Sequence, residues 1–213
     1  MTASYDFLDA SPVIPVIAIE AIEHAVPLAE ALVAGGIVNL EVTLRTQYGL
    51  DAIRLISEQV PGANVGVGTV CSGGEFDAAV DAGASFVVSP GQSDELFERA
   101  LLTDVPFLPG AVTATEVMAA KSAGFTILKF FPAGTSGGAA AIKAFSGPFA
   151  DIQFVPTGGI KPENAQEYLS LSNVRAVGGT WLTPIDLIKS GRWGEIEAIA
   201  RQASSLNAWL GDH

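Results

Sequence analysis

The sequence predicts an α/β protein, a single-domain (β/α)8 barrel, and three observations carry that prediction. The chain has 213 residues and alternates short apolar runs with longer amphipathic runs along its length. Eight apolar runs start 19 to 27 residues apart, which leaves room for one helix between parallel neighbours. No linker, low-complexity tract or charge block divides the sequence. We therefore expect one domain over residues 1–213, and an open doubly wound sheet is the structural alternative.

The eight apolar runs are the expected strands. They cover residues 13–19, 37–44, 64–70, 85–90, 106–111, 125–131, 152–157 and 175–182. Amphipathic stretches between them predict helices over residues 23–34, 51–59, 75–81, 94–102 and 116–122. Residues 1–10 are expected to form a leading segment and residues 186–213 closing helices.

Helix ends carry their own signals. Two S/T-x-x-E patterns predict N-terminal capping boxes, Ser72 with Glu75 and Thr113 with Glu116. Glycines follow three Ala-rich helices just before the next strand, where a left-handed residue without a Cβ is expected: Gly35, Gly83 and Gly124.

Charge excludes several classes of partner. The formal net charge is −12, and no run of Lys or Arg interrupts the chain. Nucleic acid and anionic membrane surfaces are therefore not expected partners, because neutralising phosphates needs clustered positive charge. A small anion is still compatible with a few cations focused in a pocket. Charged residues make up only 16% of the chain, so we expect another subunit to cover part of its surface.

The sequence also predicts a cytoplasmic protein. The longest uncharged run, residues 59–74, contains a proline and several glycines, which argues against a membrane-spanning helix. The first basic residue is Arg45, whereas a signal peptide needs a charged start. Cys71 is the single cysteine and forms no internal disulfide; we expect it to be a small buried residue rather than a nucleophile. His24 and His213 lack partners at ligand spacing, so no metal or other cofactor is expected.

Strand two supplies the first candidate site residues. Apolar and polar side chains alternate over residues 39–45, so Leu40 and Val42 share one face and Glu41 and Arg45 the other. If the apolar face meets the helices, Glu41 and Arg45 point into the barrel. The structural alternative is an ion pair, or an Arg that leaves the barrel at the loop.

Strand six places Lys129 in the middle of an apolar run, with Phe130 and Phe131 after it. A buried lysine acts either structurally, with its ammonium reaching a carboxylate such as Glu41, or as a Schiff-base nucleophile. The nucleophile must be partly unprotonated to attack a carbonyl. We therefore expect Glu41 to stand slightly apart from Lys129 and to reach the reaction through substrate or water.

Two glycine turns lie at the last two strands, where barrels commonly bind phosphate: Thr157-Gly158-Gly159 after strand seven and Gly178-Gly179-Thr180 in strand eight. Thr69 closes strand three and Pro90 closes strand four, both at the rim where the strands end. Such a threonine is commonly a cap or turn residue, and Pro90 is expected to shape a loop bordering the substrate pocket.

Six spaced motifs together resemble one enzyme family. They are LEVTLR at 40–45, GVGTV at 66–70, SPG at 89–91, LKFFPA at 128–133, PTGGI at 156–160 and GGTWL at 178–182. In this order they resemble the class I 2-keto-3-deoxy-6-phosphogluconate (KDPG) aldolases, which also cleave 4-hydroxy-2-oxoglutarate (KHG). The resemblance covers nearly the whole chain.

The resemblance implies roles for these residues. Lys129 matches the Schiff-base lysine and Glu41 the general acid/base, while Arg45 and Thr69 match residues that hold the substrate carboxylate. Phe131 is similar to the ring beside the bound pyruvyl group and Thr157 to a hydroxyl near C4. The matching phosphate site comprises Gly158, Gly159, Gly179 and Thr180. The family also implies a homotrimer and no metal.

Two departures from the family pattern stand out. Thr180 occupies a position where Ser is usual, and Gly134 follows FFPA where Glu is common. VTLR at 42–45 favours the gluconate-type substrate over the galactonate type. The predicted reactions are cleavage of KDPG to pyruvate and glyceraldehyde 3-phosphate, and of KHG to pyruvate and glyoxylate. The alternatives are a sugar-phosphate isomerase or epimerase of the same architecture, and a non-catalytic phosphate-binding barrel.

Overall fold

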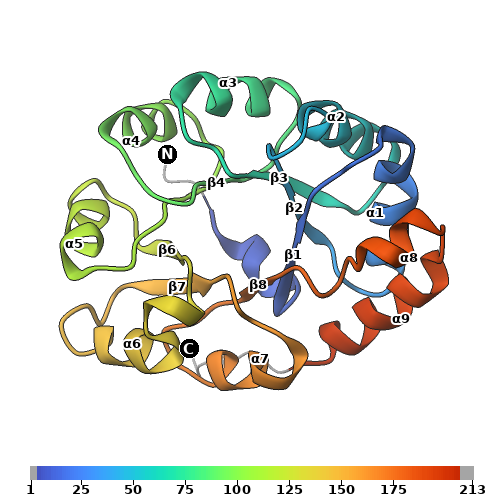
Figure 1. Ribbon diagram of the computed structural model, residues 1–213. Helices are drawn as coiled ribbons and strands as arrows, with labels where there is room; N and C mark the ends of the chain where they lie inside the picture. Colours follow the sequence, from blue (N-terminus) through green and yellow to red (C-terminus); the bar gives the residue numbers. More distant parts are fainter. Residues whose placement is uncertain (1–3, 207–213) are drawn as a thin grey trace.

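The computed structural model describes residues 4–206 and places parallel strands inside a ring of helices (Figure 1). The strands are β1 (Val13–Ile17), β2 (Asn39–Thr43), β3 (Asn64–Gly68), β4 (Val87–Val88), β5 (Phe107–Leu108), β6 (Ile127–Phe130), β7 (Gln153–Pro156) and β8 (Val177–Gly179). The α-helices are α1 (Ala25–Ala34), α2 (Gly49–Gln59), α3 (Gly73–Asp81), α4 (Asp94–Leu101), α5 (Ala114–Ser122), α6 (Gly138–Phe145), α7 (Pro162–Leu169), α8 (Ile185–Lys189) and α9 (Trp193–Ser204). The 3-10 helices are η1 (Asp6–Ala10), η2 (Ile22–His24) and η3 (Gly134–Ser136).

The predicted α/β class with parallel strands is confirmed, and the strands form two sheets. One contains six strands in the order β5-β4-β3-β2-β1-β8, and the other pairs β6 with β7. The first and last strands are neighbours, and this order lacks the reversal that defines a doubly wound sheet. A single continuous eight-stranded ladder is not present. Between β5 and β6 the pairing shrinks to one bridge, Gly110 with Lys129, next to Pro109, which has no N–H to donate.

All eight expected strands are present, and each is shorter than predicted. The run 85–90, for example, contains only the two strand residues of β4, because the chain then turns into the loop at Pro90. Helices α6 and α7 fall between the predicted ranges. The leading segment contains η1, and the closing helices are α8 and α9. The predictions for residues 1–3 and 207–213, including His213, lie outside the described residues.

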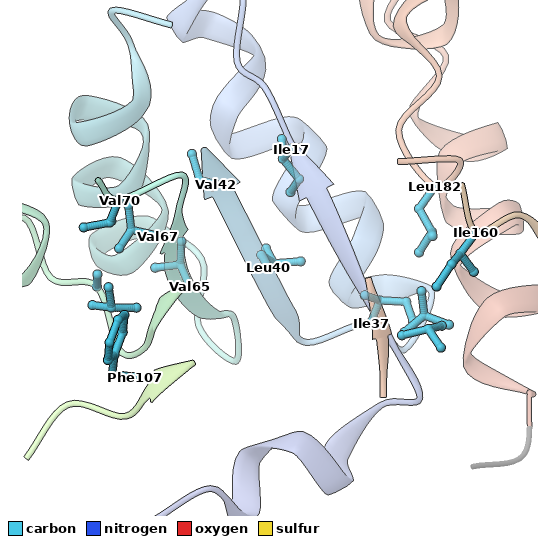
Figure 2. Close-up of a cluster of buried hydrophobic side chains, with 14 of the residues drawn as sticks. Ile17, Ile37, Leu40, Val42, Val65, Val67, Val70, Phe107, Ile160 and Leu182 are labelled. Carbon is cyan, nitrogen blue, oxygen red and sulfur yellow. The ribbon is translucent and has the colours of Figure 1, made fainter. Parts of the chain in front are cut away.

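Apolar side chains form two cores. The larger lies between strands and helices and includes Leu40 and Val42 (Figure 2). Leu128 also belongs to it. The smaller comprises buried residues from the leading segment and from six strands or their approaches: Leu8, Ile14, Phe86, Val88, Leu108, Ile127, Val155 and Ala176. Leu128 contributes to the larger core and Ile127 to the smaller one, so alternation along β6 gives Lys129 the same facing as Ile127.

The leading segment closes the amino-terminal end of the strands. In Figure 1 its blue helix crosses the middle of the ring. Leu8 is buried in the smaller core, and Asn39 Nδ2 donates a hydrogen bond to the Phe7 carbonyl at 2.8 Å. Tyr5 Oη donates to the Phe107 carbonyl at 2.8 Å, and burial raises the pKa of Tyr5 despite that bond. The remaining access to the interior is therefore at the carboxyl ends of the strands.

Helix caps follow the predicted pattern in part. The Thr113–Glu116 capping box is complete. Ser72 Oγ accepts from the Glu75 N–H, but the Glu75 carboxylate accepts from the Cys71 N–H at 2.7 Å, one residue earlier than a capping box requires.

The C-terminal glycine prediction is confirmed at two of three positions. Gly83 (φ 95°) and Gly124 (φ 96°) are left-handed, but at the end of α1 this conformation belongs to Gly36 (φ 88°) and not Gly35. A Cβ on Gly35 would lie 2.7 Å from the Glu197 carbonyl oxygen, so close approach of α9 explains that glycine.

Within residues 4–206 no helix is both long and apolar enough to cross a membrane.

Candidate active site

Lys129 and Glu41 form a buried ion pair. Lys129 lies in β6 and Glu41 in β2, and each side chain is only 4% exposed. Lys129 Nζ donates a hydrogen bond to Glu41 Oε1 at 2.9 Å. The expectation that Glu41 stands slightly apart is therefore wrong. Each charge loses hydration in the interior, and direct contact is the arrangement that offsets that loss for both.

Phe131 lies beside the amine. It is the first residue after β6, and Lys129 Nζ lies 5.4 Å from the centre of its ring. The Phe131 ring is partly buried and also borders the adjacent cavity. The Lys129 amine therefore has an aromatic ring on one side and the Glu41 carboxylate on another. Phe131 therefore lies near the Lys129 amine and also forms part of the wall of a cavity that a ligand can enter.

A cavity of about 480 Å³ opens at the carboxyl ends of the strands. Its lining contains seven of the predicted site residues: Arg45, Phe131, Thr157, Gly158, Gly159, Gly179 and Thr180. Val16, Ile160 and Gly178 complete the lining. Gly178 belongs to a predicted glycine turn, whereas Val16 and Ile160 were not expected at the site; Ile160 lies in the PTGGI motif, and Val16 carries no polar signal. Four predicted site residues are not in this lining: Lys129, Glu41, Thr69 and Pro90. Pro90 borders a separate cavity of about 170 Å³ with Cys71.

Arg45 is the cation of the larger cavity. It lies two residues after β2 and is exposed. The alternative ion pair with Glu41 is not formed, because Glu41 pairs with Lys129. Among residues 4–206 nothing forms a hydrogen bond or ion pair with Arg45, so its guanidinium is available to an anion.

Thr69 has an unusual backbone. Its φ is 66°, and it is the single non-glycine residue with positive φ in the part of the chain that the structure describes. A side chain in this region costs about 1–3 kcal/mol, and such residues concentrate at functional sites. Thr69 directly follows β3 and is partly buried, so the strain sets the direction in which its side chain leaves the strand.

The predicted phosphate loops need their glycines for two different reasons. Gly158 (φ 97°) and Gly159 (φ 76°) adopt left-handed conformations. Gly178 and Gly179 are required for space instead: a Cβ on Gly178 would lie 3.0 Å from Thr157 Cβ, and one on Gly179 would enter the Trp181 ring. All four glycines line the cavity, so their backbone is accessible to a small anion there.

Thr157 presents an unused hydroxyl to the cavity. The residue is 5% exposed, and its Oγ1 has no hydrogen-bond partner within residues 4–206. A buried polar atom without a partner is costly, so a bound ligand is the natural partner for it. The Gly134 N–H donates to the Gly158 carbonyl at 2.9 Å, which anchors the loop at this departure from the family pattern without a Glu side chain.

Histidine and cysteine do not form a second centre among residues 4–206. No three His, Cys, Asp or Glu side chains gather there as metal ligands, and His24 contacts the Trp193 ring. Cys71 is exposed, so the expectation of a buried residue is wrong; the loop after β3 carries it outward. Desolvation, followed by the charge of Glu75, raises the pKa of the Cys71 thiol, which lowers its nucleophilicity at neutral pH.

Comparison with known proteins agrees with this geometry. The family model "KDPG and KHG aldolase" matches residues 5–199. A 2-dehydro-3-deoxy-phosphogluconate aldolase of Pseudomonas aeruginosa is 50% identical over 191 residues, covering 90% of this chain and 87% of the relative. A KHG/KDPG aldolase of Escherichia coli is 45% identical over 202 residues, covering 95% of each chain.

A solved structure extends the comparison to three dimensions. The crystal structure of the KDPG aldolase from Legionella pneumophila, with pyruvate captured as a covalent carbinolamine intermediate, superposes with a TM-score of 0.91. It is 45% identical and covers 93% of this chain and 96% of that chain. With a family model over most of its length and relatives at this identity, the chain belongs to the KDPG and KHG aldolase family.

Proposed function

We propose that this protein is a class I aldolase that cleaves KDPG to pyruvate and glyceraldehyde 3-phosphate. The observation that carries the proposal is the buried Lys129 amine, in contact with Glu41 and beside an aromatic wall of the cavity at the strand ends. Schiff-base chemistry needs an amine, a group that exchanges protons with it and space for a keto acid. Family membership supports the same reaction.

The direct contact between Glu41 and Lys129 serves the first step. A proton passes from Nζ to Oε1 along the 2.9 Å hydrogen bond, which converts two buried charges into a neutral amine and a carboxylic acid. The free amine then attacks the C2 ketone of the substrate. The Glu41 carboxylic acid then gives its proton to the carbinolamine hydroxyl, which leaves as water, so that an iminium remains on Lys129 and Glu41 is again a carboxylate.

Glu41 then acts as the base for carbon–carbon cleavage. Through a water molecule it removes the proton of the C4 hydroxyl, the C3–C4 bonding electrons move to the iminium nitrogen, and the aldehyde product leaves. The resulting enamine takes a proton at C3 from the same relay. Water hydrolyses the new iminium, which releases pyruvate and restores the Lys129 amine. No external redox partner or metal is required for the balance of these steps.

Arg45, Thr69 and Phe131 are proposed to hold the pyruvyl half of the substrate. The unpaired guanidinium of Arg45 suits a charge-assisted contact with the carboxylate. The Thr69 hydroxyl is the second proposed donor, directed by the strained backbone after β3. Phe131 supplies an apolar surface beside the carbon bound to Lys129, and Pro90 shapes the neighbouring loop.

The distal half is proposed to bind at the two glycine turns. Gly158, Gly159, Gly179 and Thr180 surround the phosphate, and the unpaired Thr157 hydroxyl lies near C4. Thr180 retains the hydroxyl of the serine that is usual at its position.

KHG cleavage to pyruvate and glyoxylate is the proposed second activity. The Escherichia coli relative is named for both substrates, and the Lys129–Glu41 chemistry concerns the pyruvyl half that both substrates share.

Product analysis tests these activities. Purified protein incubated with KDPG is expected to yield pyruvate and glyceraldehyde 3-phosphate in equal amounts, and with KHG to yield pyruvate and glyoxylate. Lys129→Met should abolish both reactions while the protein keeps its fold. Rearranged sugar phosphate without pyruvate would point to an isomerase, and binding of KDPG without products would point to a non-catalytic phosphate-binding barrel.

We also propose that the strands close into one (β/α)8 barrel that forms a single domain. Pairing of β1 with β8 supports closure, as do the bridges from Gly110 to Lys129 and from Thr157 to Gly178, which connect the two sheets.

A homotrimer is proposed from the family. Exposed apolar side chains on α4 and α5 support a subunit contact: Leu101, Leu102 and Met118. Sedimentation equilibrium measures the number of subunits in the assembly.

The exposed Cys71 thiol supports the proposal of a reducing, cytoplasmic location.

A further inference from the structure

Gly68 is the last residue of β3, and its backbone conformation does not require glycine. Glycine inside a strand weakens it, because it offers no side chain to pack. Gly68 is not among the glycines with positive φ, so an alanine fits its backbone conformation. The reason for glycine at this position must therefore lie in what occupies the space beside it.

That space is filled by the side chain of Glu41. An ideal Cβ placed on Gly68 would lie 2.7 Å from Glu41 Cγ and 2.8 Å from its Cδ, and nearer still to Oε1. Oε1 is the oxygen that accepts the hydrogen bond from Lys129 Nζ. In the register of the two strands Glu41 pairs with Gly66 and Thr43 with Gly68, so the Glu41 side chain leans toward the carboxyl end of β3.

We propose that Gly68 is a positioning residue for the reaction: its missing side chain lets the Glu41 carboxylate lie against the Lys129 amine. This inference rests on the proposed aldolase function. Glu41 is only 3% exposed, so its carboxylate has no solvent-filled space to move into while keeping the same contact. A methyl group at position 68 displaces Oε1 from Nζ and weakens the steps in which Glu41 moves a proton.

The proposal predicts a folded Gly68→Ala protein. The atoms nearest to the new methyl group belong to the end of one side chain and not to backbone, so the side chain yields and the strand keeps its place. Arg45 lies outside this contact, and binding of the keto acid carboxylate is unaffected. Loss of activity in a folded protein that still binds the keto acid distinguishes positioning from a general structural role.

Exchange of the pyruvate methyl protons with solvent deuterium, followed by NMR, reports proton transfer at C3 directly. Gly68→Ala is expected to lower the maximal exchange rate by at least ~10-fold, within the range that general acid–base catalysis contributes, and to leave the KM for pyruvate within ~3-fold of the wild-type value. The variant should stay folded, and its midpoint of thermal unfolding should fall less than that of Glu41→Gln, because a displaced carboxylate still compensates the Lys129 ammonium whereas an amide carries no charge. A normal exchange rate, or failure to fold, would overturn the proposal.

Two other glycines provide matched controls. Gly66 lies on the same strand, but a Cβ there would meet the ring of buried Phe86 at 2.5 Å. Gly66→Ala is therefore expected to lower the unfolding midpoint while exchange per folded molecule is retained. Gly74 on α3 has no atom within 4 Å of an added Cβ, so Gly74→Ala should leave both quantities unchanged. An equal effect of Gly66→Ala and Gly68→Ala on exchange per folded molecule would contradict a specific role for Gly68.

A shorter acid tests whether the effect passes through Glu41. Glu41→Asp removes one methylene and draws the carboxylate back from the methyl group of alanine at position 68. The double variant is expected to lose less exchange activity than the product of the two single losses; independent, multiplicative losses would overturn the proposal. Wild-type protein without any exchange would instead overturn the aldolase assignment, so the two failures are distinguishable.

Discussion

The charges of Lys129 and Glu41 depend on each other in the protein interior. Both side chains are 4% exposed, and each is the partner in the other's ion pair. Breaking a buried pair on one side costs about 3–5 kcal/mol, because it leaves a charge without compensation, whereas replacing both partners by apolar groups is close to neutral. The same pair that conducts the proposed chemistry therefore also affects stability.

A double-mutant comparison measures this coupling. Glu41→Gln is expected to lower the free energy of unfolding by about 3 kcal/mol, since it leaves the Lys129 ammonium without a carboxylate. Glu41→Leu combined with Lys129→Met should restore most of that loss and remain inactive. Urea denaturation gives both values, and equal destabilisation by the single and double variants would refute the coupling.

Removing the side chain of Thr69 is expected to weaken substrate binding with little change in stability. Glycine adopts the φ of 66° without the strain that threonine bears, but it also gives the unfolded chain more conformational entropy. Because these two effects oppose each other, Thr69→Gly is expected to change the free energy of unfolding by less than about 1 kcal/mol. The lost hydroxyl should raise the KM for pyruvate-forming substrates. Steady-state kinetics and thermal unfolding test both parts. Unchanged KM with a large loss of stability would show that Thr69 is only a structural residue.

Among the secondary-structure elements, α5 has the most complete cap. The Glu116 carboxylate accepts hydrogen bonds from the Val112 and Thr113 N–H groups at 2.9 and 2.8 Å and from the Thr113 hydroxyl at 2.9 Å. Burial raises the pKa of Glu116, but these bonds outweigh burial and hold the pKa below its ordinary value. A lowered pKa means that the charged form contributes stability above pH 4.5, and that this contribution is lost as the pH falls through the folded-state pKa.

Glu116→Gln tests that contribution. At pH 7 the variant should be less stable than the wild type by about 1 kcal/mol, the usual value of a cap with a favourable helix-dipole interaction. The difference is expected to shrink as the pH falls below the ordinary carboxyl value of 4.5, because the wild-type carboxylate is then protonated. Denaturation curves across this pH range provide the comparison, and a difference independent of pH would contradict the charge as its cause.

Local signals in the sequence predicted elements better than their exact ends. Periodicity located every strand, and the Thr113 and Glu116 pattern identified the cap of α5. The expected left-handed Gly35 was displaced by one residue because α9, distant in sequence, approaches the backbone there. The Ser72 cap differs for a local reason, since the Glu75 carboxylate accepts a hydrogen bond from the Cys71 N–H instead of the Ser72 N–H. Contacts between distant segments are what periodicity does not encode.

The candidate site was likewise only partly predictable from the sequence. Strand alternation correctly placed Glu41 inward, and the motifs brought Arg45, Phe131 and the glycine turns to one cavity. The direct Lys129–Glu41 contact was not expected, because it depends on the width of the interior and on the space that Gly68 leaves. The exposed position of Cys71 likewise depends on the path of a loop.

At the scale of the whole molecule, the leading segment closes one end of the strands and leaves the site at the other. Leu8 of η1 is 1% exposed, and Asp9 forms an ion pair with Arg175 at the approach to β8. The interior around Ile127 therefore excludes water from the end opposite the cavity. A dry interior strengthens the Lys129–Glu41 interaction on which the chemistry depends.

Truncation of Leu8 tests this closure. Leu8→Ala is expected to reduce the free energy of unfolding by about 2–5 kcal/mol, the range for leucines removed from a packed core. Glu58→Ala on α2 is the control: its side chain is exposed and lies outside the proposed subunit contact, and a change within about 0.5 kcal/mol is expected. Similar effects of the two substitutions would contradict a core role for the leading segment.

The central claim is that Lys129 forms a Schiff base with the keto group, and covalent trapping measures it most directly. Protein incubated with pyruvate and reduced with borohydride should lose activity as a carboxyethyl group becomes attached to the Lys129 Nζ, which peptide mass spectrometry can locate. Omission of pyruvate, or the Lys129→Met variant, should prevent this modification. An active enzyme that is not modified at Lys129, or an inactivating adduct on another lysine, would contradict the account.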